Sequence, residues 1–267
     1  MTEAATDQRD FLALHLESMA PHRAILRSIE AKFMSRVPLV HPVLDIGSGD
    51  GHFASLAYRE PIDVGIDVME RDLKEAATLR PAVFLDLVKA SATRMPFPDG
   101  AFKTVLSNCV IEHIPDVDAV MSEIGRVLQP GGTFATTLPS EHYPEYLLGS
   151  TLGRRIGFER GATAYGNFFN RISHHHHVDP PAVWKQRLDA NGLELEEHTY
   201  YFSKSAHHTF DLAHYLGVPN LASKRLFGKW VLHPLQTKPF EWWYRRYYDE
   251  PLPEAGAYQF VRARKRA

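Results

Sequence analysis

The chain has 267 residues, of which 44% are apolar and 23% charged, the composition of an ordinary globular protein. Its formal net charge of −2 gives no general attraction to nucleic acid, and no apolar run reaches the roughly 18–20 residues that a membrane-spanning helix needs. The single cysteine, Cys109, excludes an internal disulfide and is compatible with a reducing compartment. We therefore predict a cytoplasmic protein with no transmembrane segment.

Residues 8–36 are predicted to be helical, because apolar side chains recur there at helical spacing. Pro21 divides this stretch into two helices, since proline favours a first turn over a helix interior. We define residues 1–38 as an N-terminal helical arm. The simplest interpretation is a lid packed on a sheet edge, and the functional one is an arm that also covers a bound cofactor.

A glycine-rich turn follows the predicted strand Val43–Ile46 and opens a helix from about Gly51. Its glycines let the backbone turn sharply and let a ligand approach without meeting a Cβ atom. The turn departs from the dinucleotide fingerprint G-x-G-x-x-G, because His52 occupies the place of its third glycine. Asp45, two residues before the turn, would repel a pyrophosphate and attract a cation. This charge pattern favours S-adenosylmethionine, which carries a sulfonium and an ammonium, over NAD.

Short apolar strands and helices alternate along the rest of the chain, which predicts a parallel, doubly wound α/β sheet. Ligands bind such sheets at the carboxyl ends of the strands, so polar residues there should line one crevice. The candidates at or after predicted strand ends are Asp45, Asp67, Ser91 and Asn108. The predicted strands are 43–46, 62–66, 83–85, a strand from 105, 133–138, 193–202 and 257–264, and the predicted helices between them include 51–59, 70–79 and one ending at about 191.

Several segments in register resemble the class I S-adenosylmethionine-dependent methyltransferases. They are the glycine stretch 43–54, the strand 62–67 that ends in an acid, the loop 90–102, the strand and turn 105–114, and the Pro-Gly-Gly unit 127–134. The likeness covers roughly residues 40–140. It implies a Rossmann-like, seven-stranded sheet with six parallel strands and one antiparallel, and S-adenosylmethionine as cofactor with S-adenosylhomocysteine as product.

The resemblance also implies roles for single residues. Asp45 and the glycine turn would hold the amino-acid end of the cofactor, and Asp67, 20 positions after Gly47, would hold the ribose diol. Ser91 stands where many relatives carry an acid for the adenine amino group, and its uncharged hydroxyl makes a weaker acceptor. The implied cofactor-binding set is Asp45, Gly47, Ser48, Gly49, Gly51, Asp67, Val68, Ser91, Ala92, Asn108, Cys109 and His113.

Glu112 and His113 follow the fourth predicted strand. Quinone-methylating and RNA-methylating branches of the family carry Glu-x-x-Glu-His here and hold a divalent metal with it. In this chain Cys109 replaces the first acid, and two ligands rarely hold a metal, so we predict none. Glu112 would instead cap or pack the turn while His113 lies at the methionine end of the cofactor. The alternative is that His113 acts as a general base, which makes it the catalytic candidate.

We interpret residues 139–178 and 204–255 as cap insertions over the acceptor site of a single domain. The first shows no clean period and contains the run His174–His177, predicted as a structural or pocket-lining cluster rather than a metal site. The second is too long for an unstructured loop, so helices are expected at Phe210–Leu216 and Ala222–Leu235. Its aromatic and arginine-rich part, 242–248, is interpreted as the core of a helical cap; docking to a membrane interface is the alternative.

The predicted function is S-adenosylmethionine-dependent methyl transfer to an O, N or C atom of a small-molecule acceptor, which the cap suggests is apolar or aromatic. A non-catalytic protein that binds S-adenosylmethionine or S-adenosylhomocysteine is the main alternative, and an NAD-dependent oxidoreductase is less favoured. No nucleic-acid partner is expected. The acceptor and the oligomeric state are left open.

Overall fold

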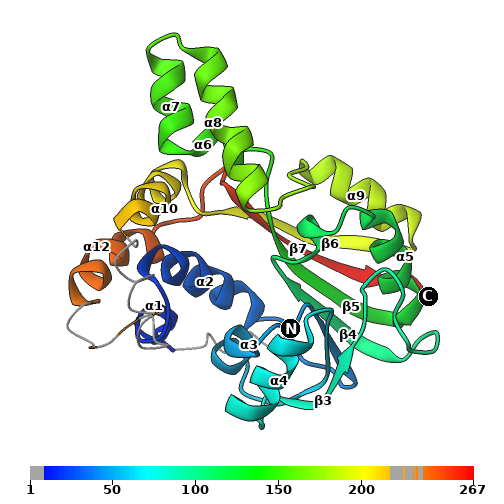
Figure 1. Cartoon of the computed structure of the whole chain (residues 1–267). Coiled ribbons are helices and arrows are strands. Elements are labelled where there is room, and N and C mark those ends of the chain that lie inside the picture. Colours follow the sequence, from blue (N-terminus) through cyan, green and yellow to red (C-terminus); the bar gives the residue numbers. More distant parts are fainter. Residues whose placement is uncertain (1–8, 217–224, 226–230, 232, 234–236) are drawn as a thin grey trace. The chain divides into compact units, whose positions relative to one another are not determined.

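The computed structural model describes residues 9–216, 225, 231, 233 and 237–267. The chain forms two compact units (Figure 1). The helical unit consists of residues 1–36, 141–173 and 200–258, and the sheet unit of residues 37–140, 174–199 and 259–267. Most of the N-terminal arm and of both predicted insertions belongs to the helical unit. The assignment of the whole chain to one domain stays a prediction.

The sheet confirms the predicted fold class. Its seven strands lie in the order β3-β2-β1-β4-β5-β7-β6, six of them parallel and one antiparallel. The chain order reverses on either side of β1, so β1 and β4 flank the switch point at which such sheets bind ligands. The strands are β1 Val43–Ile46, β2 Ile62–Asp67, β3 Phe84–Lys89, β4 Phe102–Asn108, β5 Leu128–Pro139, β6 Leu193–Tyr201 and β7 Tyr258–Lys265.

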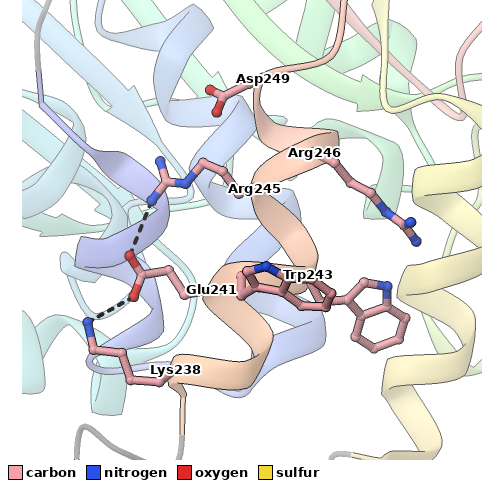
Figure 2. A pocket seen from close by; sticks show the side chains of 7 residues that line it. Lys238, Glu241, Trp243, Arg245, Arg246 and Asp249 are labelled. Atoms are coloured by element: carbon pink, nitrogen blue, oxygen red, sulfur yellow. Dashed lines mark hydrogen bonds and ion pairs between the residues drawn. The ribbon is translucent and has the colours of Figure 1, made fainter.

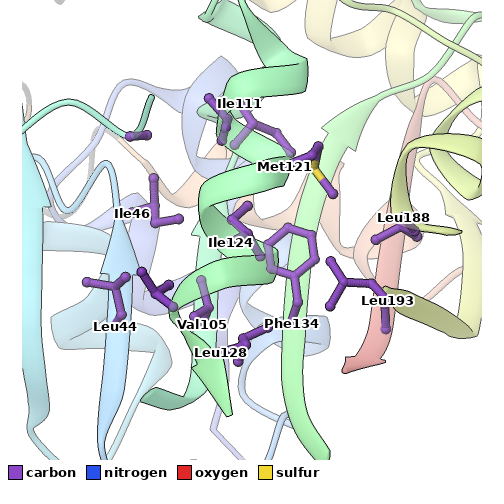
Figure 3. Packing of buried hydrophobic residues seen from close by; sticks show 14 of the residues in the cluster. Leu44, Ile46, Val105, Ile111, Met121, Ile124, Leu128, Phe134, Leu188 and Leu193 are labelled. Atoms are coloured by element: carbon purple, nitrogen blue, oxygen red, sulfur yellow. The ribbon is translucent and has the colours of Figure 1, made fainter. Parts of the chain in front are cut away.

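Helices α5 and α9 close one apolar core of the sheet unit. Their inward side chains, such as Ile124 and Leu188, pack with Val105 and Phe134 of the sheet (Figure 3). Gly125 of α5 lets the helices approach closely, because a Cβ atom there would lie 2.7 Å from the Asn191 carbonyl oxygen. The helices of this unit are α3 His52–Ala57, α4 Glu70–Leu79, the 3₁₀ turn η1 Ile111–His113, α5 Val117–Val127 and α9 Pro181–Ala190.

The helical unit contains both predicted N-terminal helices, divided at Pro21 as the sequence indicates. Its second insertion contains a helix that includes the predicted range 210–216 but begins at Lys204. The predicted helix at 222–235 lies outside the described residues, apart from three isolated positions. The helices of this unit are α1 Phe11–Leu16, α2 Pro21–Met34, α6 Tyr143–Tyr146, α7 Leu148–Arg155, α8 Glu159–Ile172, α10 Lys204–Leu216 and α12 Lys238–Tyr248.

The region 139–178, which lacked a clean sequence period, contains the helices α7 and α8. Glycines interrupt the apolar periodicity of these two helices. Here they allow close contacts and do not mark turns. A Cβ atom at Gly149 would lie 2.6 Å from the Tyr165 ring, and one at Gly166 would lie 2.7 Å from the Pro144 carbonyl oxygen. The spacing Gly149-x-x-x-Gly153 could have indicated a closely packed helix, because residues four apart share a helix face.

The aromatic and arginine-rich segment lies on α12 and supplies a small core. Tyr244, Tyr247 and Tyr248 are buried, whereas Trp242 is 85% exposed. Figure 2 shows the pocket beside this helix, where Glu241 pairs with both Lys238 and Arg245. The buried tyrosines support the interpretation of a helical cap core. In the part of the chain that the structure describes, no helix is long and apolar enough to span a bilayer.

The glycine contacts in the helical unit can be tested with a matched pair of alanine variants. Gly166→Ala should lower the free energy of unfolding by roughly 1–3 kcal/mol, because its Cβ meets backbone that cannot move aside. In the same helix, the atoms nearest to a Cβ at Gly161 belong to the Phe158 ring, a side chain that is 61% exposed and can give way. The control Gly161→Ala should be neutral or stabilising by up to about 1 kcal/mol. Urea unfolding followed by circular dichroism measures both, and equal effects would contradict the packing argument.

Candidate functional site

The carboxyl ends of β1, β2 and β4 lie level with one another. Ile46 of β1 pairs in register with Ile66 of β2 and with Ser107 of β4. The residues that follow them, Gly47, Asp67 and Asn108, therefore leave the sheet at the same edge. On the outer side of β2, Asp67 pairs with Lys89 of β3. The structure thus gathers the predicted strand-end residues at one edge of the sheet unit.

The glycine loop is fixed to the second strand by its backbone. The amides of Gly47 and Ser48 both donate to the Ile66 carbonyl, at 2.8 and 3.0 Å. All three glycines have positive φ, and Gly51 is the N-cap of α3. A Cβ atom at Gly49 would meet only the Gly47 carbonyl oxygen, 4.0 Å away, so this part of the loop is open to an approaching ligand.

Two carboxyl groups share this loop. Asp67 accepts hydrogen bonds from the amides of Gly49, at 3.0 Å, and Met69, at 2.7 Å. Asp45 is buried, and its burial, with a further contribution from the negative charge of Asp67, raises the pKa of its carboxyl to about 8. Tyr58, at the end of α3, lies near Asp45. Burial of Tyr58, with a smaller effect of the Asp45 charge, raises the pKa of its phenol. That this pair selects a cationic ligand over a pyrophosphate stays a prediction of the sequence.

The loop after β3 places Ser91 and Ala92 beside this edge. Ala92 is buried, and the exposed Ser91 hydroxyl lies 2.8 Å from the Thr93 hydroxyl. Sequence reasoning missed the side chain that anchors this loop. Arg126 of α5 donates to the carbonyls of Phe97, at 2.6 Å, and Met95, at 3.1 Å, and also pairs with Glu123 and Asp99.

Apolar side chains next to Asp67 are unusually exposed. Val68 is 59% exposed and Met69 51% exposed, although both are large hydrophobic residues. Val68 was in the predicted cofactor set, whereas Met69 was not. Exposed apolar atoms that follow an acidic strand end form a surface on which a flat, apolar ring could rest.

The chain turns sharply after β4. The Asn108 side-chain oxygen accepts from the Thr137 hydroxyl at 2.9 Å, and the Cys109 amide donates to the Thr137 carbonyl at 3.0 Å. Cys109 is buried and has a φ of 49°, in the left-handed region that is uncommon for residues other than glycine. This turn leads into η1, which carries the catalytic candidate His113.

The structure adds a third residue to Glu112 and His113. His175 reaches the same place, and the His113 and His175 rings stack with centroids 5.3 Å apart. Glu112 is buried, and its Oε1 lies 3.6 Å from Nε2 of His113. Burial, with a smaller effect of His113, lowers the pKa of His175 to about 3, so the ring is neutral near pH 7. The sequence conceals this grouping because the residues come from separate segments.

Known proteins resemble the part of the chain that carries the strand-end residues. The family described as "Methyltransferase domain" matches residues 44–136, from β1 into β5. An uncharacterized methyltransferase of Mycobacterium sp. strain KMS is 37% identical over 91 residues, which cover 34% of this chain and 35% of that protein. The match is thus to a methyltransferase domain, over about a third of the chain. It spans about a third of the length of that relative.

Solved methyltransferase structures share the fold over most of this chain. An S-adenosylmethionine-dependent methyltransferase from Mesorhizobium loti covers 94% of the chain over 100% of its own length, with a TM-score of 0.51 at 16% identity. Geranyl diphosphate methyltransferase, solved with GPP and sinefungin, covers 91% of the chain over 78% of its own length, with a TM-score of 0.55 at 15% identity. At such identities the likeness concerns the fold alone.

The raised pKa of Asp45 predicts a pH dependence of stability. Between about pH 4 and pH 8 the folded protein holds a proton on Asp45 that the unfolded chain has lost. The free energy of unfolding should therefore fall as the pH rises through this window. Asp45→Asn keeps the shape of the side chain but cannot ionise. Between pH 5 and pH 8 the free energy of unfolding should therefore fall by at least about 2 kcal/mol more for the wild type than for the variant. Urea titrations without ligand measure this difference, and parallel pH profiles would contradict the assignment.

Proposed function

We propose that this protein transfers the methyl group of S-adenosylmethionine to a small-molecule acceptor. The proposal rests chiefly on the carboxyl pair Asp45 and Asp67 at the glycine loop, on the carboxyl edge of a methyltransferase-type sheet. A buried carboxyl beside a second acid favours a cationic ligand over a pyrophosphate. The open side of Gly49 gives that ligand room.

The site residues take distinct parts in this proposal. Asp45 and the glycine loop bind the ammonium end of the donor, Asp67 accepts from the ribose diol, and Ser91 with Ala92 borders the adenine. When bound, S-adenosylmethionine supplies an electrophilic methyl group on a sulfonium. The residues of the site position the donor and exclude water, which are the main contributions expected for such a transfer.

His113 is the proposed general base where the acceptor atom carries a proton. Its Nδ1 lies 3.2 Å from the His174 carbonyl, which only accepts, so Nδ1 carries the proton of the neutral ring. Nε2 is then the basic nitrogen. The side chain is 38% exposed, which leaves it accessible from solvent.

A small acceptor fits the charges of the helical unit better than a nucleic acid. Arginines there engage carboxylates of the same unit: Arg245 pairs with Asp10 and Arg27 with Glu30. Binding to a phosphate backbone relies on cations that are available to the phosphates. The aromatic residues of α12 are the basis for proposing an apolar or aromatic acceptor.

The role of Asp67 predicts a loss of donor affinity. Asp67→Ala should weaken binding of S-adenosylmethionine and S-adenosylhomocysteine by about 10–100-fold, because a hydrogen bond to a charged group contributes about 1.5–3 kcal/mol. Asp86→Ala is a matched control, since it removes an exposed carboxylate from the middle of β3. Calorimetric titration measures both variants. Equal affinity of Asp67→Ala and wild type would refute the assigned role.

Donor binding should also release a proton. Near pH 7 the Asp45 carboxyl is largely protonated, and a cation placed beside it favours the charged form. Titrations of S-adenosylmethionine in two buffers of different ionisation enthalpy should therefore report proton release by the wild type, and none by Asp45→Asn. Buffer-independent heats for the wild type would contradict this coupling.

Turnover separates an enzyme from a non-catalytic binder. Formation of S-adenosylhomocysteine with a panel of small apolar and aromatic acceptors is the direct measurement. Tight donor binding without turnover on any acceptor would favour the binder. NAD should not bind, because Asp45 and Asp50 would face its pyrophosphate.

A further inference from the structure

The helical hairpin formed by α7 and α8 carries large apolar side chains at its end. Within the helical unit, the turn that joins these two helices points away from α6 and α10 (Figure 1). Leu152, in the last turn of α7, is 50% exposed, and Ile156 and Phe158 are 79% and 61% exposed. We call these three residues, together with Arg155 and Arg160, the hairpin tip. Exposed apolar side chains that gather in one place mark sites of contact with a protein or a membrane.

The two helices of the hairpin pack closely through small residues. The Ser150 hydroxyl donates to the Ala162 carbonyl at 3.0 Å, and a Cβ atom at Gly153 would lie 3.1 Å from the Cβ of Ala162. A contact this narrow has no space for larger side chains, so Leu152 and Ile156 lie outside it. The exposure of the hairpin tip thus follows from how the two helices pack.

The other end of the hairpin, its base, is anchored within the helical unit. Asp211 of α10 is buried and accepts from the amides of Leu148, at 2.9 Å, and Gly149, at 3.4 Å, at the start of α7. The same carboxylate accepts from the Tyr165 hydroxyl of α8 at 2.9 Å. One buried side chain therefore holds both helices, and the hairpin is a fixed projection and not a loose loop.

Two arginines of the hairpin tip have no acidic partner. Arg154 pairs with both Glu145 and Glu159. Arg155 and Arg160 are exposed, and in the described part of the chain neither pairs with a carboxylate. The segment 148–172 contains four arginines and one glutamate, although the formal net charge of the whole chain is −2. Unpaired positive charge thus lies beside the exposed apolar side chains.

We propose that the hairpin tip docks on a lipid bilayer with anionic headgroups. Apolar side chains enter the boundary between headgroups and acyl chains, and neighbouring cations are attracted to the anionic lipids. Arginine suits this position because its apolar stem can lie along the boundary while its charge stays among the headgroups. A second copy of the chain fits less well, because a symmetric contact would bring the arginines of two tips together. A nucleic acid would pair with the arginines but leave the apolar side chains in water.

The length of the helices sets the depth of docking. The last turn of α7, Leu152–Arg155, spans about 5 Å along the helix axis, which matches the roughly 5–10 Å to which interfacial apolar groups are buried. Arg160 lies about 3 Å along α8 from Phe158, at the level of the headgroups. Phe168 and Ile172 are 48% and 47% exposed. They lie about 15 and 21 Å from Phe158 along the helix, so in an upright hairpin they stay in water.

Sedimentation with lipid vesicles tests the docking on the purified, tag-free chain. The probe is a vesicle of phosphatidylcholine mixed with phosphatidylserine. The wild type should bind it, and should bind vesicles of phosphatidylcholine alone at least about 5-fold more weakly, because anionic lipids attract each basic residue near the surface. High salt should weaken binding to the mixed vesicles for the same reason.

The base of the same hairpin supplies matched controls for the apolar side chains. Ile156→Ser combined with Phe158→Ser should weaken binding to the mixed vesicles by at least about 10-fold, because two apolar side chains no longer enter the bilayer. Ile172→Ser combined with Phe168→Ser removes the same residue types from the base. This control should change binding by less than about twofold.

An arginine pair tests the charge in the same way. Arg155→Gln should weaken binding to the mixed vesicles by about 5-fold and leave the weak binding to phosphatidylcholine unchanged. Arg171→Gln removes an exposed arginine about 20 Å along α8 from the hairpin tip, beyond the screening length of about 8–10 Å at physiological salt. This control should change binding by less than about twofold.

Three results would overturn the proposal. The first is that the wild type does not bind the mixed vesicles, or binds phosphatidylcholine alone equally well. The second is an equal loss in the tip and base variants, which would place the contact elsewhere. The third is a dimer in solution that the tip variants dissociate without any vesicle binding, which would assign the tip to a second copy. Circular dichroism checks that each variant is folded. Vesicle binding needs neither donor nor acceptor, so its outcome is separate from that of the proposed methyl transfer.

Discussion

The arrangement of the strand ends depends on the close approach of Gly47 to Val110. A Cβ atom at Gly47 would lie 2.4 Å from a Val110 methyl carbon, so only glycine lets the loop after β1 rest on the turn after β4. The backbone bonds from this loop to Ile66, and from Gly49 to Asp67, join the end of β2 to the same contact. The ends of β1, β2 and β4 are thereby held together, and the polar residues on them keep fixed positions relative to one another.

That arrangement has an electrostatic consequence. Burial raises the pKa of the Asp45 carboxyl to about 8, and the charge of Asp67, brought close where the ends of β1 and β2 are held together, adds to this shift. A bound cation would lower the free-energy cost of ionising Asp45 beside Asp67. The same constraint that shapes the loop therefore also selects the charge of the ligand.

The sequence predicted the sheet unit well, because glycines and prolines separate its elements. Glu70–Leu79 matches α4 at both ends, and Val43–Ile46 matches β1. The third strand was placed at 83–85 but extends over Phe84–Lys89, since Asp86 interrupts its apolar run. Residues 139–178 showed no clean period, so α7 and α8 were not predicted; there Gly149 and Gly166 serve close packing.

Contacts between distant segments were harder to predict than elements. The sequence indicated Asp45, Asp67 and Asn108 as neighbours, because parallel strands bring their carboxyl ends to one edge whatever lies between them. No such rule places His175 beside Glu112. That contact depends on the left-handed conformation of His174 and on two amide bonds to one carbonyl, which residue type alone does not specify.

The turn after β4 joins the strand-end residues to the turn that carries Glu112 and His113. Cys109 extends the pairing with β5 by one amide bond to Thr137, and its left-handed backbone then turns the chain into η1. One side of this turn presents Asn108 at the glycine loop, and the other buries Glu112 and offers its carbonyl to the histidine run. A change in the backbone at Cys109 would therefore alter the positions of Asn108 and of the Glu112 turn together.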